Sequence, residues 1–194
     1  MRVLVLHAHP VETSFNRSLY NAALETLRGN GHEVDALNLY EDNFQAVMSR
    51  EERLRYHDVP ENITAEIKPY VDRVRAAEAI VIIHPVWNYG YPAILKGFFD
   101  RIFITGVSFV LEDGKLRTTL NNITKVVFVT SYGGDRFRTW LMGDPPRRLA
   151  RRWAWATFRT LFPPKYLALY KMDRRTEPEL KAFIDKVQRA LARL

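Results

Sequence analysis

Hydrophobic residues occur along the chain in two patterns, as short unbroken aliphatic runs and as stripes at helical spacing. The runs RVLVL (2–6), AIVII (79–83) and KVVFVT (125–130) carry no charge beyond their first residue. Such runs are typical of strands that are buried on both faces of a parallel sheet. Alternating or β-prone segments at 33–39 and 166–170 predict two further strands.

Helical spacing of apolar residues predicts four helices, at 14–28, 60–78, 92–103 and from Thr176 onward. The last one begins with Thr176-Glu-Pro-Glu179, a capping box in which side chains bond free backbone N–H groups of the first turn. Within 108–120, the pair Asp113-Gly114 separates two short β-prone runs, which predicts a hairpin.

Five strands that alternate with helices predict an α/β fold, a doubly wound parallel sheet with helices on both faces. No linker-like segment, low-complexity stretch or repeat divides the chain, so we expect a single domain over residues 1–194. At this length the natural strand order is 2-1-3-4-5, that of flavodoxin-like sheets.

The composition narrows the class of protein. A chain that is 47% hydrophobic and 26% charged is typical of a soluble globular protein. The absence of cysteine excludes disulfides, thiolate metal sites and cysteine nucleophiles, and we expect no metal. No apolar run approaches the ~20 residues of a membrane span and the start lacks a signal-peptide pattern, so a cytoplasmic location is expected.

The net charge of +7 is unevenly distributed. From Arg136 onward there are fifteen Lys and Arg against five Asp and Glu, so the first 135 residues carry a net charge of −3. This asymmetry permits binding to nucleic acid or an anionic membrane, and equally to an anionic substrate such as a nicotinamide dinucleotide. Charge alone does not choose among them.

Three loops follow the first, third and fourth strands, and ligands of such sheets bind at the edge where the strands' carboxyl ends meet. The first loop, HAHPVETSFN (7–16), has Thr13, Ser14 and Asn16 at a helix start, where free N–H groups and the helix dipole favour an anion. The alternative is that Ser14 or Thr13 only caps the helix. His9 is either a phosphate or ribose contact or a structural residue, and neither GxGxxG nor a Walker motif is present.

The second loop, PVWNYG (85–90), concentrates aromatic rings, backbone amides and a glycine. Amides could meet the polar edge of a flat ring that Trp87 and Tyr89 cover. The alternative is that both aromatics belong to the core, but it does not explain the presence of Asn88-Tyr-Gly in the loop.

In the third loop, TSYGGDRFR (130–138), Gly133-Gly134 would let backbone approach a ligand, and Tyr132 could stack or donate a hydrogen bond.

The three loops together resemble one known family. HAHPVETSFN, HPVWNYGYPAILKGFFDRIF and TSYGG, in that order, are similar to the NAD(P)H:quinone oxidoreductases, flavodoxin-like reductases with a tightly held flavin. The likeness covers nearly the whole chain, including Leu39-Tyr40 and Ser49-Arg50. It implies one FAD or FMN per chain, NAD(P)H as co-substrate, and ping-pong hydride transfer through flavin N5 to a quinone-like or other aromatic acceptor. It also implies a homodimer with the active site at a two-fold interface.

The resemblance further implies which residues bind the flavin. Those expected at its phosphate or pyrophosphate are His9, Thr13, Ser14, Phe15 and Asn16. Those expected along the isoalloxazine are Pro85, Val86, Trp87, Asn88 and Tyr89 on one side, and Thr130, Ser131, Tyr132, Gly133 and Gly134 on the other. The flavin itself does the chemistry, and Tyr132 is the one candidate catalytic side chain.

The chain departs from the family after the glycine pair. Mammalian quinone reductases use a tyrosine and a histidine there to stabilise reduced flavin, whereas 135–143 reads DRFRTWLMG, with Met142 in the place of the histidine. Arg136 and Arg138 could stabilise anionic reduced flavin, bind the NADPH phosphate, or simply be solvated. FMN and FAD both stay open, because the first loop resembles FAD-binding members but the segment before 60–78 is shorter than theirs.

The segment 143–162 carries five arginines among Trp153, Trp155 and Phe158. Its basic and aromatic character suits a membrane surface or nucleic acid. We favour a core helix between the fourth and fifth strands, with one face formed by Leu149, Trp153 and Ala156 and another by Arg148, Arg152 and Arg159. A third alternative is that the aromatics cover a partner subunit.

The rival hypothesis to an enzyme is a flavin-bearing regulatory subunit, like those resembling this family that sit on potassium efflux systems. Its basic carboxyl half would then be the docking surface. A purely nucleic-acid role explains the charge but none of the three loops, so no nucleic-acid partner and no membrane contact are expected.

Overall fold

Five strands form one parallel sheet in a computed structural model that describes residues 1–158, 160 and 163–194. The strands are β1 (Arg2–His7), β2 (Glu33–Asn38), β3 (Ala79–Val86), β6 (Lys125–Tyr132) and β7 (Lys165–Leu169). Their order is β2-β1-β3-β6-β7, all pairs being parallel. This confirms the predicted order 2-1-3-4-5.

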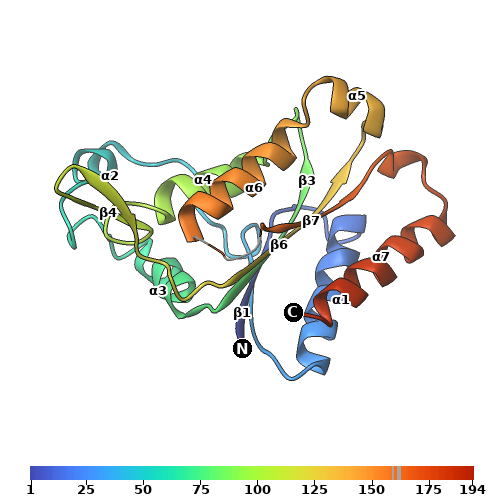
Figure 1. Cartoon of the computed structure of the whole chain (residues 1–194), viewed down its shortest axis with the longest axis horizontal. Coiled ribbons are helices and arrows are strands. Elements are labelled where there is room, and N and C mark those ends of the chain that lie inside the picture. Colours follow the sequence, from blue (N-terminus) through green and yellow to red (C-terminus); the bar gives the residue numbers. More distant parts are fainter. Residues whose placement is uncertain (159, 161–162) are drawn as a thin grey trace.

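Helices cover both faces of the sheet (Figure 1). On one face lie α1 (Phe15–Gly29) and α7 (Glu177–Leu191); on the other lie α3 (Lys68–Ala76), α4 (Ala93–Ile102) and α6 (Pro145–Phe158). Shorter elements are α2 (Arg50–Leu54), α5 (Arg136–Leu141), a 3-10 helix (Met172–Arg174) and the antiparallel hairpin of β4 (Phe109–Glu112) and β5 (Lys115–Thr118). The hairpin turns at Asp113-Gly114, as predicted, with φ of 51° and 72°.

Successive residues of the central strands face opposite hydrophobic cores. Val3 and Val5 of β1 pack with α1 and α7, whereas Leu4 and Leu6 pack with α3 and α4. All four side chains are fully buried. Because both faces are covered, neither set of positions can be polar, which explains the unbroken aliphatic runs.

The predicted helix at 60–78 is wrong for its first part. The helix α3 begins only at Lys68, and the preceding residues form turns. The buried amide of Asn62 holds these turns by donating to the carbonyl oxygens of Tyr56 (3.0 Å) and Thr105 (2.8 Å). Ile63 and Ile67 pack on the core from this segment, so the apolar spacing reflected burial rather than helix.

The predicted core helix between the last two strands of the sheet is confirmed as α6, but its buried face differs. Buried positions are Pro146, Ala150, Ala154 and Phe158, while Leu149 and Ala156 are exposed and Trp153 is partly buried. The small side chains of Ala150 and Ala154 let the helix lie close to the sheet. Trp153 instead reaches sideways to Phe99 (ring centroids 4.4 Å apart). Arg159, expected on the polar face, lies outside the described residues.

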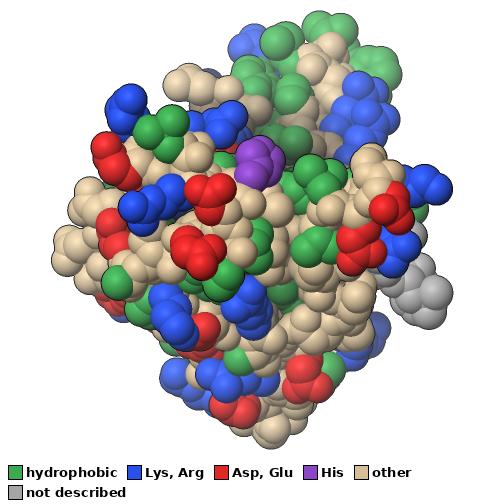
Figure 2. All heavy atoms as spheres, turned by 90° about the vertical axis from the view of Figure 1, so that its left-hand side faces the viewer, with side chains coloured by type: hydrophobic (Ala, Val, Ile, Leu, Met, Phe, Trp, Pro, Cys, Tyr) green, Lys and Arg blue, Asp and Glu red, His purple; other side chains and the backbone are tan. Residues whose placement is uncertain are grey.

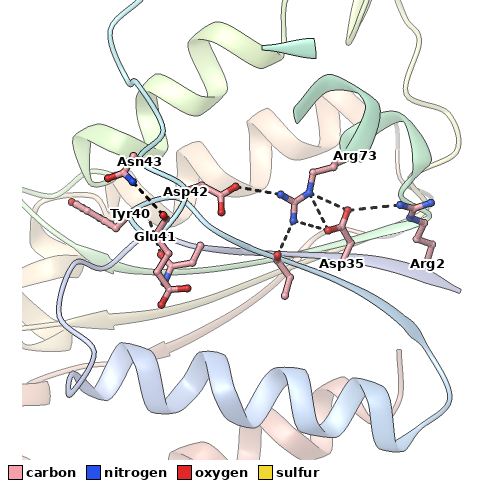
Figure 3. Close-up of polar contacts among 9 residues, drawn as sticks. Arg2, Asp35, Tyr40, Glu41, Asp42, Asn43 and Arg73 are labelled. Atoms are coloured by element: carbon pink, nitrogen blue, oxygen red, sulfur yellow. Dashed lines mark hydrogen bonds and ion pairs between the residues drawn. The ribbon is translucent and has the colours of Figure 1, made fainter. Parts of the chain in front are cut away.

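Ion pairs hold the segment after β2 in place (Figure 3). Arg73 of α3 donates from Nη2 to Asp35 at 2.6 Å and to the Ala36 carbonyl at 2.7 Å, and from Nη1 to Asp42 at 3.4 Å. The Asp35 side chain is only 17% exposed, so this pair is better shielded from solvent than an ordinary surface pair. The loop that carries Tyr40 is therefore anchored to α3 through Asp42.

Two histidines are buried near the carboxyl ends of β1 and β3. His7 stacks on Tyr20 with ring centroids 4.6 Å apart, and His84 bonds the Pro85 carbonyl through Nδ1 at 2.9 Å. Burial lowers the pKa of each imidazole to about 4. Both rings are therefore neutral in the folded protein at neutral pH.

Gly97 provides a test of packing between α4 and the segment before α2. A Cβ there would come within 2.6 Å of the Ala46 Cβ, so Gly97→Ala should lower the free energy of unfolding by about 1–3 kcal/mol. Gly29→Ala is the matched control, because nothing lies within 4 Å of its added Cβ. Urea denaturation measures both variants, and equal stabilities would contradict the packing described.

The buried histidines predict a loss of stability in mild acid. Their folded pKa of about 4 lies below the unfolded value of about 6.5, so below pH 6.5 only the unfolded chain takes up protons. The free energy of unfolding should fall by about 2 kcal/mol per histidine between pH 7 and pH 5. In urea titrations, His84→Gln should remove about half of this fall. Stability that does not change over this range would refute the assignment.

Candidate functional site

The strands at the centre of the sheet end at different heights. The β1–β3 pairing stops at His7 and Ile83, whereas the β3–β6 pairing continues to Val86 and Tyr132. Three residues of β3, 84–86, therefore extend beyond the end of β1. The first loop passes over this step, with the Ala8 amide still bonded to the Ile83 carbonyl at 3.1 Å.

Both strands run further than the sequence pattern predicted. Pro85 and Val86 lie in β3, and Ser131 and Tyr132 extend β6 beyond the predicted end at Thr130, so these four site candidates belong to strands rather than loops. The predicted runs end earlier because the next residues, His84 and Ser131, are polar although both are buried. The ladder nevertheless continues, since backbone pairing does not depend on side-chain polarity.

In the first loop, Ser14 caps α1. Its Oγ accepts from the Arg17 amide at 3.1 Å, so the capping alternative holds for this residue. The first turn of α1 contains no acidic side chain, which leaves its N–H groups suited to an anion. Thr13 is exposed, while Phe15 packs toward α7, 6.4 Å from the Phe183 ring.

Two contacts join the first loop to the others. Asn16, 3% exposed, donates from Nδ2 to the Ser131 Oγ at 3.0 Å, which links α1 to β6. The His9 ring lies 5.8 Å from the Trp87 ring, and its Nδ1 accepts from the Val11 amide at 3.1 Å. Partial burial lowers the pKa of His9. The three candidate loops therefore meet, as the topology predicted.

The second loop is a tight turn that presents its aromatics to solvent. Trp87 and Gly90 exchange two backbone hydrogen bonds, and Asn88 and Tyr89 between them have φ of 47° and 54°. Trp87 is 42% and Tyr89 40% exposed, which excludes the core-aromatic alternative. The left-handed residues of this turn are Asn88 and Tyr89 rather than Gly90.

A left-handed conformation is uncommon for tyrosine and costs about 1 kcal/mol, so the fold holds Tyr89 in strain at a sheet edge.

The third loop contains a buried tyrosine and two exposed glycines. The Tyr132 hydroxyl donates to the Asp144 carboxylate at 2.9 Å and hydrogen-bonds the Tyr166 hydroxyl at 2.6 Å. Burial, followed by these neighbours, raises the pKa of Tyr132 far above its usual value, so its proton stays in place. Gly133 and Gly134 are exposed, and a Cβ at Gly133 would lie 3.1 Å from the Asp173 carboxylate.

Sequence reasoning missed the polar network behind Tyr132. Arg147 donates from Nε to Asp144 at 2.8 Å and from Nη2 to the Tyr170 hydroxyl at 2.9 Å. Tyr170 stacks on Tyr132, with centroids 4.6 Å apart. The available signal was the tyrosine pair at the two ends of 166–170, which we interpreted only as a strand.

The two arginines of α5 behave differently. The Arg138 side chain is 81% exposed and pairs with Asp135 at 3.5 Å. The Asp135 carboxylate caps α5 by accepting from the Arg138 amide at 2.8 Å, which lowers the pKa of Asp135. Arg136 lines a cavity of about 280 Å³ that continues to the start of α6. Met142 is 57% exposed.

A smaller cavity of about 140 Å³ lies between the first loop and the segment after β2. Its lining includes His9, Arg17, Asn38, Tyr40 and Glu41. Arg17 forms an ion pair with Glu41 across it. This cavity adjoins the helix start that suits an anion.

Buried polar atoms without partners mark the same edge. Among the residues that the structure describes, the Asn16 Oδ1 and the Thr130 Oγ1 have no hydrogen-bond partner. Leaving such atoms unsatisfied is costly, so they suit a polar ligand. Together with the exposed turn at 87–90 and the free N–H groups of α1, they suit a flat ring that carries an anionic tail.

Hydrophobic and basic side chains gather at the top of the molecule in Figure 2, at the height where Figure 1 places α5. The exposed apolar side chains of this region are Phe137, Trp140 and Leu141, each 69% exposed, and Met142. Within the described part of the chain, no helix is both long and apolar enough to cross a membrane.

Comparison with known proteins agrees with the fold. A family model described as the flavodoxin-like fold matches residues 1–162. The chain is 25% identical to the structure of an NAD(P)H:quinone oxidoreductase from Methanothermobacter marburgensis, with a TM-score of 0.86 over 99% of this chain and 96% of that one. An FMN-dependent NADH-azoreductase from Bacillus anthracis, solved with FMN, is 18% identical with a TM-score of 0.75 over 99% and 98% of the two chains and shows the fold alone.

Two curated relatives extend this result. An uncharacterized NAD(P)H oxidoreductase of Haemophilus influenzae is 34% identical over 67% of this chain, and NAD(P)H dehydrogenase (quinone) 1 of Rattus norvegicus is 32% identical over 68%. The chain spans 64% of the first relative's length and 54% of the second's. With a family model that matches residues 1–162 and a sheet of the corresponding order, this chain belongs to the flavodoxin-like fold family.

Proposed function

We propose that this chain is a flavin-dependent NAD(P)H oxidoreductase. In a ping-pong cycle, hydride would pass from the nicotinamide through flavin N5 to a quinone-like or other aromatic acceptor. The observation that carries the proposal is the meeting of three ligand-suited loops through the Asn16–Ser131 hydrogen bond and the His9–Trp87 ring contact. A structural role alone would not require exposed aromatics, a free helix start and buried polar atoms that lack a partner within the described chain, all at one edge.

The phosphate end of the flavin would lie against the first loop. The start of α1 supplies N–H groups and the positive end of the helix dipole, and Ser14 supplies a hydroxyl. His9, Thr13 and Asn16 complete the proposed set. Phe15 would support the first loop without touching the phosphate, because its ring packs toward Phe183 of α7. We leave FMN and FAD as alternatives, although the cavity beside Tyr40 offers room beyond the phosphate.

The ring end would lie between the second and third loops. Trp87 and Tyr89 supply flat surface on an exposed turn, and Asn88 lies between them. Pro85 and Val86 would form the adjoining wall. On the opposite side we assign Thr130, Ser131 and the Gly133-Gly134 pair, since the Thr130 hydroxyl has no partner within the described residues.

When bound, a flavin supplies hydride acceptance and donation, so the protein's part is to bind, orient and exclude water. We assign Tyr132 a positioning role rather than direct catalysis. Its hydroxyl is turned to Asp144 and Tyr166, and its ring is 2% exposed. The network therefore holds the backbone of the glycine pair at a set distance from β7.

The relatives support the activity by their names, an NAD(P)H oxidoreductase and an NAD(P)H dehydrogenase (quinone), and they give no support to the regulatory alternative. We also propose that the protein is a cytoplasmic homodimer, since the exposed apolar side chains of α5 would be covered by a second copy. We propose neither a nucleic-acid partner nor a membrane contact.

The proposal is tested on the purified protein. We expect a yellow protein that releases a flavin on denaturation, and NAD(P)H oxidation that a quinone stimulates. Absorbance spectra and mass spectrometry of the released cofactor measure the first, and loss of absorbance at the reduced-nicotinamide band measures the second. A colourless protein that takes up neither FMN nor FAD would exclude the function.

Trp87→Ala tests the ring contact. Removing an aromatic surface that the flavin covers should weaken flavin binding about tenfold or more, as measured by fluorescence titration of the protein freed of cofactor. Thermal stability without flavin should change little, because Trp87 is 42% exposed. The matched control is Trp155→Ala, a 61% exposed tryptophan on α6 away from the three loops. Equal affinity in both variants would contradict the placement of the ring.

A further inference from the structure

The cavity between α5 and the first turn of α6 is lined mainly by arginines and aromatics. Its volume is about 280 Å³, and its walls include Arg136, Trp140, Asp144, Arg147, Arg148 and Tyr170. None of these residues belongs to the flavin contacts assigned above. The cavity is therefore a separate site, at the same carboxyl edge of the sheet.

The charges in this cavity are not balanced. Arg147 is matched by Asp144, 2.8 Å from its Nε. In contrast, no carboxylate within the described part of the chain lies at ion-pair distance from Arg136 or Arg148, so two positive charges are uncompensated. Two nearby like charges are unfavourable without an anion between them. The cavity thus has a net charge that suits a doubly charged anion.

Rigid neighbours hold Arg147, whereas Arg136 and Arg148 are exposed. Arg147 lies over the Tyr166 ring at 4.9 Å and bonds the Tyr170 hydroxyl. Gly143, with φ of 80°, brings its backbone to Arg148, where even a Cβ would be 3.4 Å from the Arg148 Nη1. A guanidinium held as that of Arg147 is binds phosphate oxygens through paired N–H donors with little loss of freedom.

A hydrogen bond also links the wall of this cavity to the strand that leads into the proposed ring site. Asp144 in its wall accepts a hydrogen bond from Tyr132, and Tyr132 directly precedes Gly133-Gly134. A ligand with one end over the ring and an anionic group further along could occupy both places.

We propose that this arginine cavity binds the 2′-phosphate of NADPH and makes Arg136 and Arg148 the residues that favour NADPH over NADH. A phosphate monoester carries about −1.5 to −2 at pH 7, which matches the two positive charges of Arg136 and Arg148 better than the single charge of a diester. The inference rests on the proposed oxidoreductase function. It adds which nicotinamide dinucleotide the enzyme uses and why.

A binding experiment tests the cavity without any turnover. Isothermal titration calorimetry should show adenosine 2′,5′-bisphosphate binding the holoprotein about tenfold or more tightly than adenosine 5′-phosphate. In Arg136→Gln/Arg148→Gln this preference should disappear. Arg148→Lys should keep part of it, because a point charge replaces the forked guanidinium. The control is Arg151→Gln/Arg152→Gln, two exposed arginines of α6 that do not line the cavity.

Kinetics give the second measurement. The ratio of KM for NADH to KM for NADPH should fall about tenfold or more in the double variant, with kcat unchanged and circular dichroism like that of the parent protein. Equal binding of the two nucleotides by the parent protein would overturn the inference while leaving the oxidoreductase proposal intact. Inorganic phosphate that binds as tightly as the bisphosphate would also overturn it, by showing an anion site that ignores the nucleotide. Preferential bisphosphate binding without oxidation of either dinucleotide would instead remove the proposed function, and with it the 2′-phosphate assignment.

Discussion

The unequal length of the strand ladders shapes the whole edge of this sheet. Because β3 and β6 stay paired to Val86 and Tyr132 after β1 has ended at His7, part of β3 has no neighbour on one side. The first loop and the start of α1 occupy that step, and the Asn16–Ser131 hydrogen bond ties them to β6. A helix start, an aromatic turn and a glycine pair thereby come together although they are distant in the sequence.

Buried polar groups then make this edge of the sheet rigid and suited to a polar ligand. Tyr132 is held by Asp144, Tyr166 and Tyr170 behind the glycine pair. In front of it, the Asn16 Oδ1 and the Thr130 Oγ1 have no hydrogen-bond partner among the described residues. Fully bonded groups of this kind rigidify a structure, and unbonded ones mark a place for a ligand. The same network supports Arg147, so the arginine cavity and the proposed flavin cleft share one rigid wall.

Much of the molecule was predictable from local patterns. The aliphatic runs, the spacing in α1, α4 and α7, the capping box at Thr176 and the turn at Asp113-Gly114 all report local constraints, and each is confirmed. Prediction failed where a long-range contact decided the conformation. Asn62 closes turns across to Thr105, which removes the helix expected before Lys68. Packing against the sheet and α4 likewise buries the face of α6 that carries Ala150 and Ala154 and leaves Leu149 and Ala156 exposed.

The sequence by itself determined the strand order, the three loops and the family to which the chain belongs, because periodicity, turn chemistry and motif order are properties of neighbouring residues. Only the tertiary structure decided that Trp87 and Tyr89 are exposed on a strained turn, that Tyr132 is buried, and that Arg136 shares a cavity with Arg148. Burial and charge balance depend on which segments meet across the sheet. These contacts between segments follow from the packing of the whole chain, and no single segment of the sequence determines them.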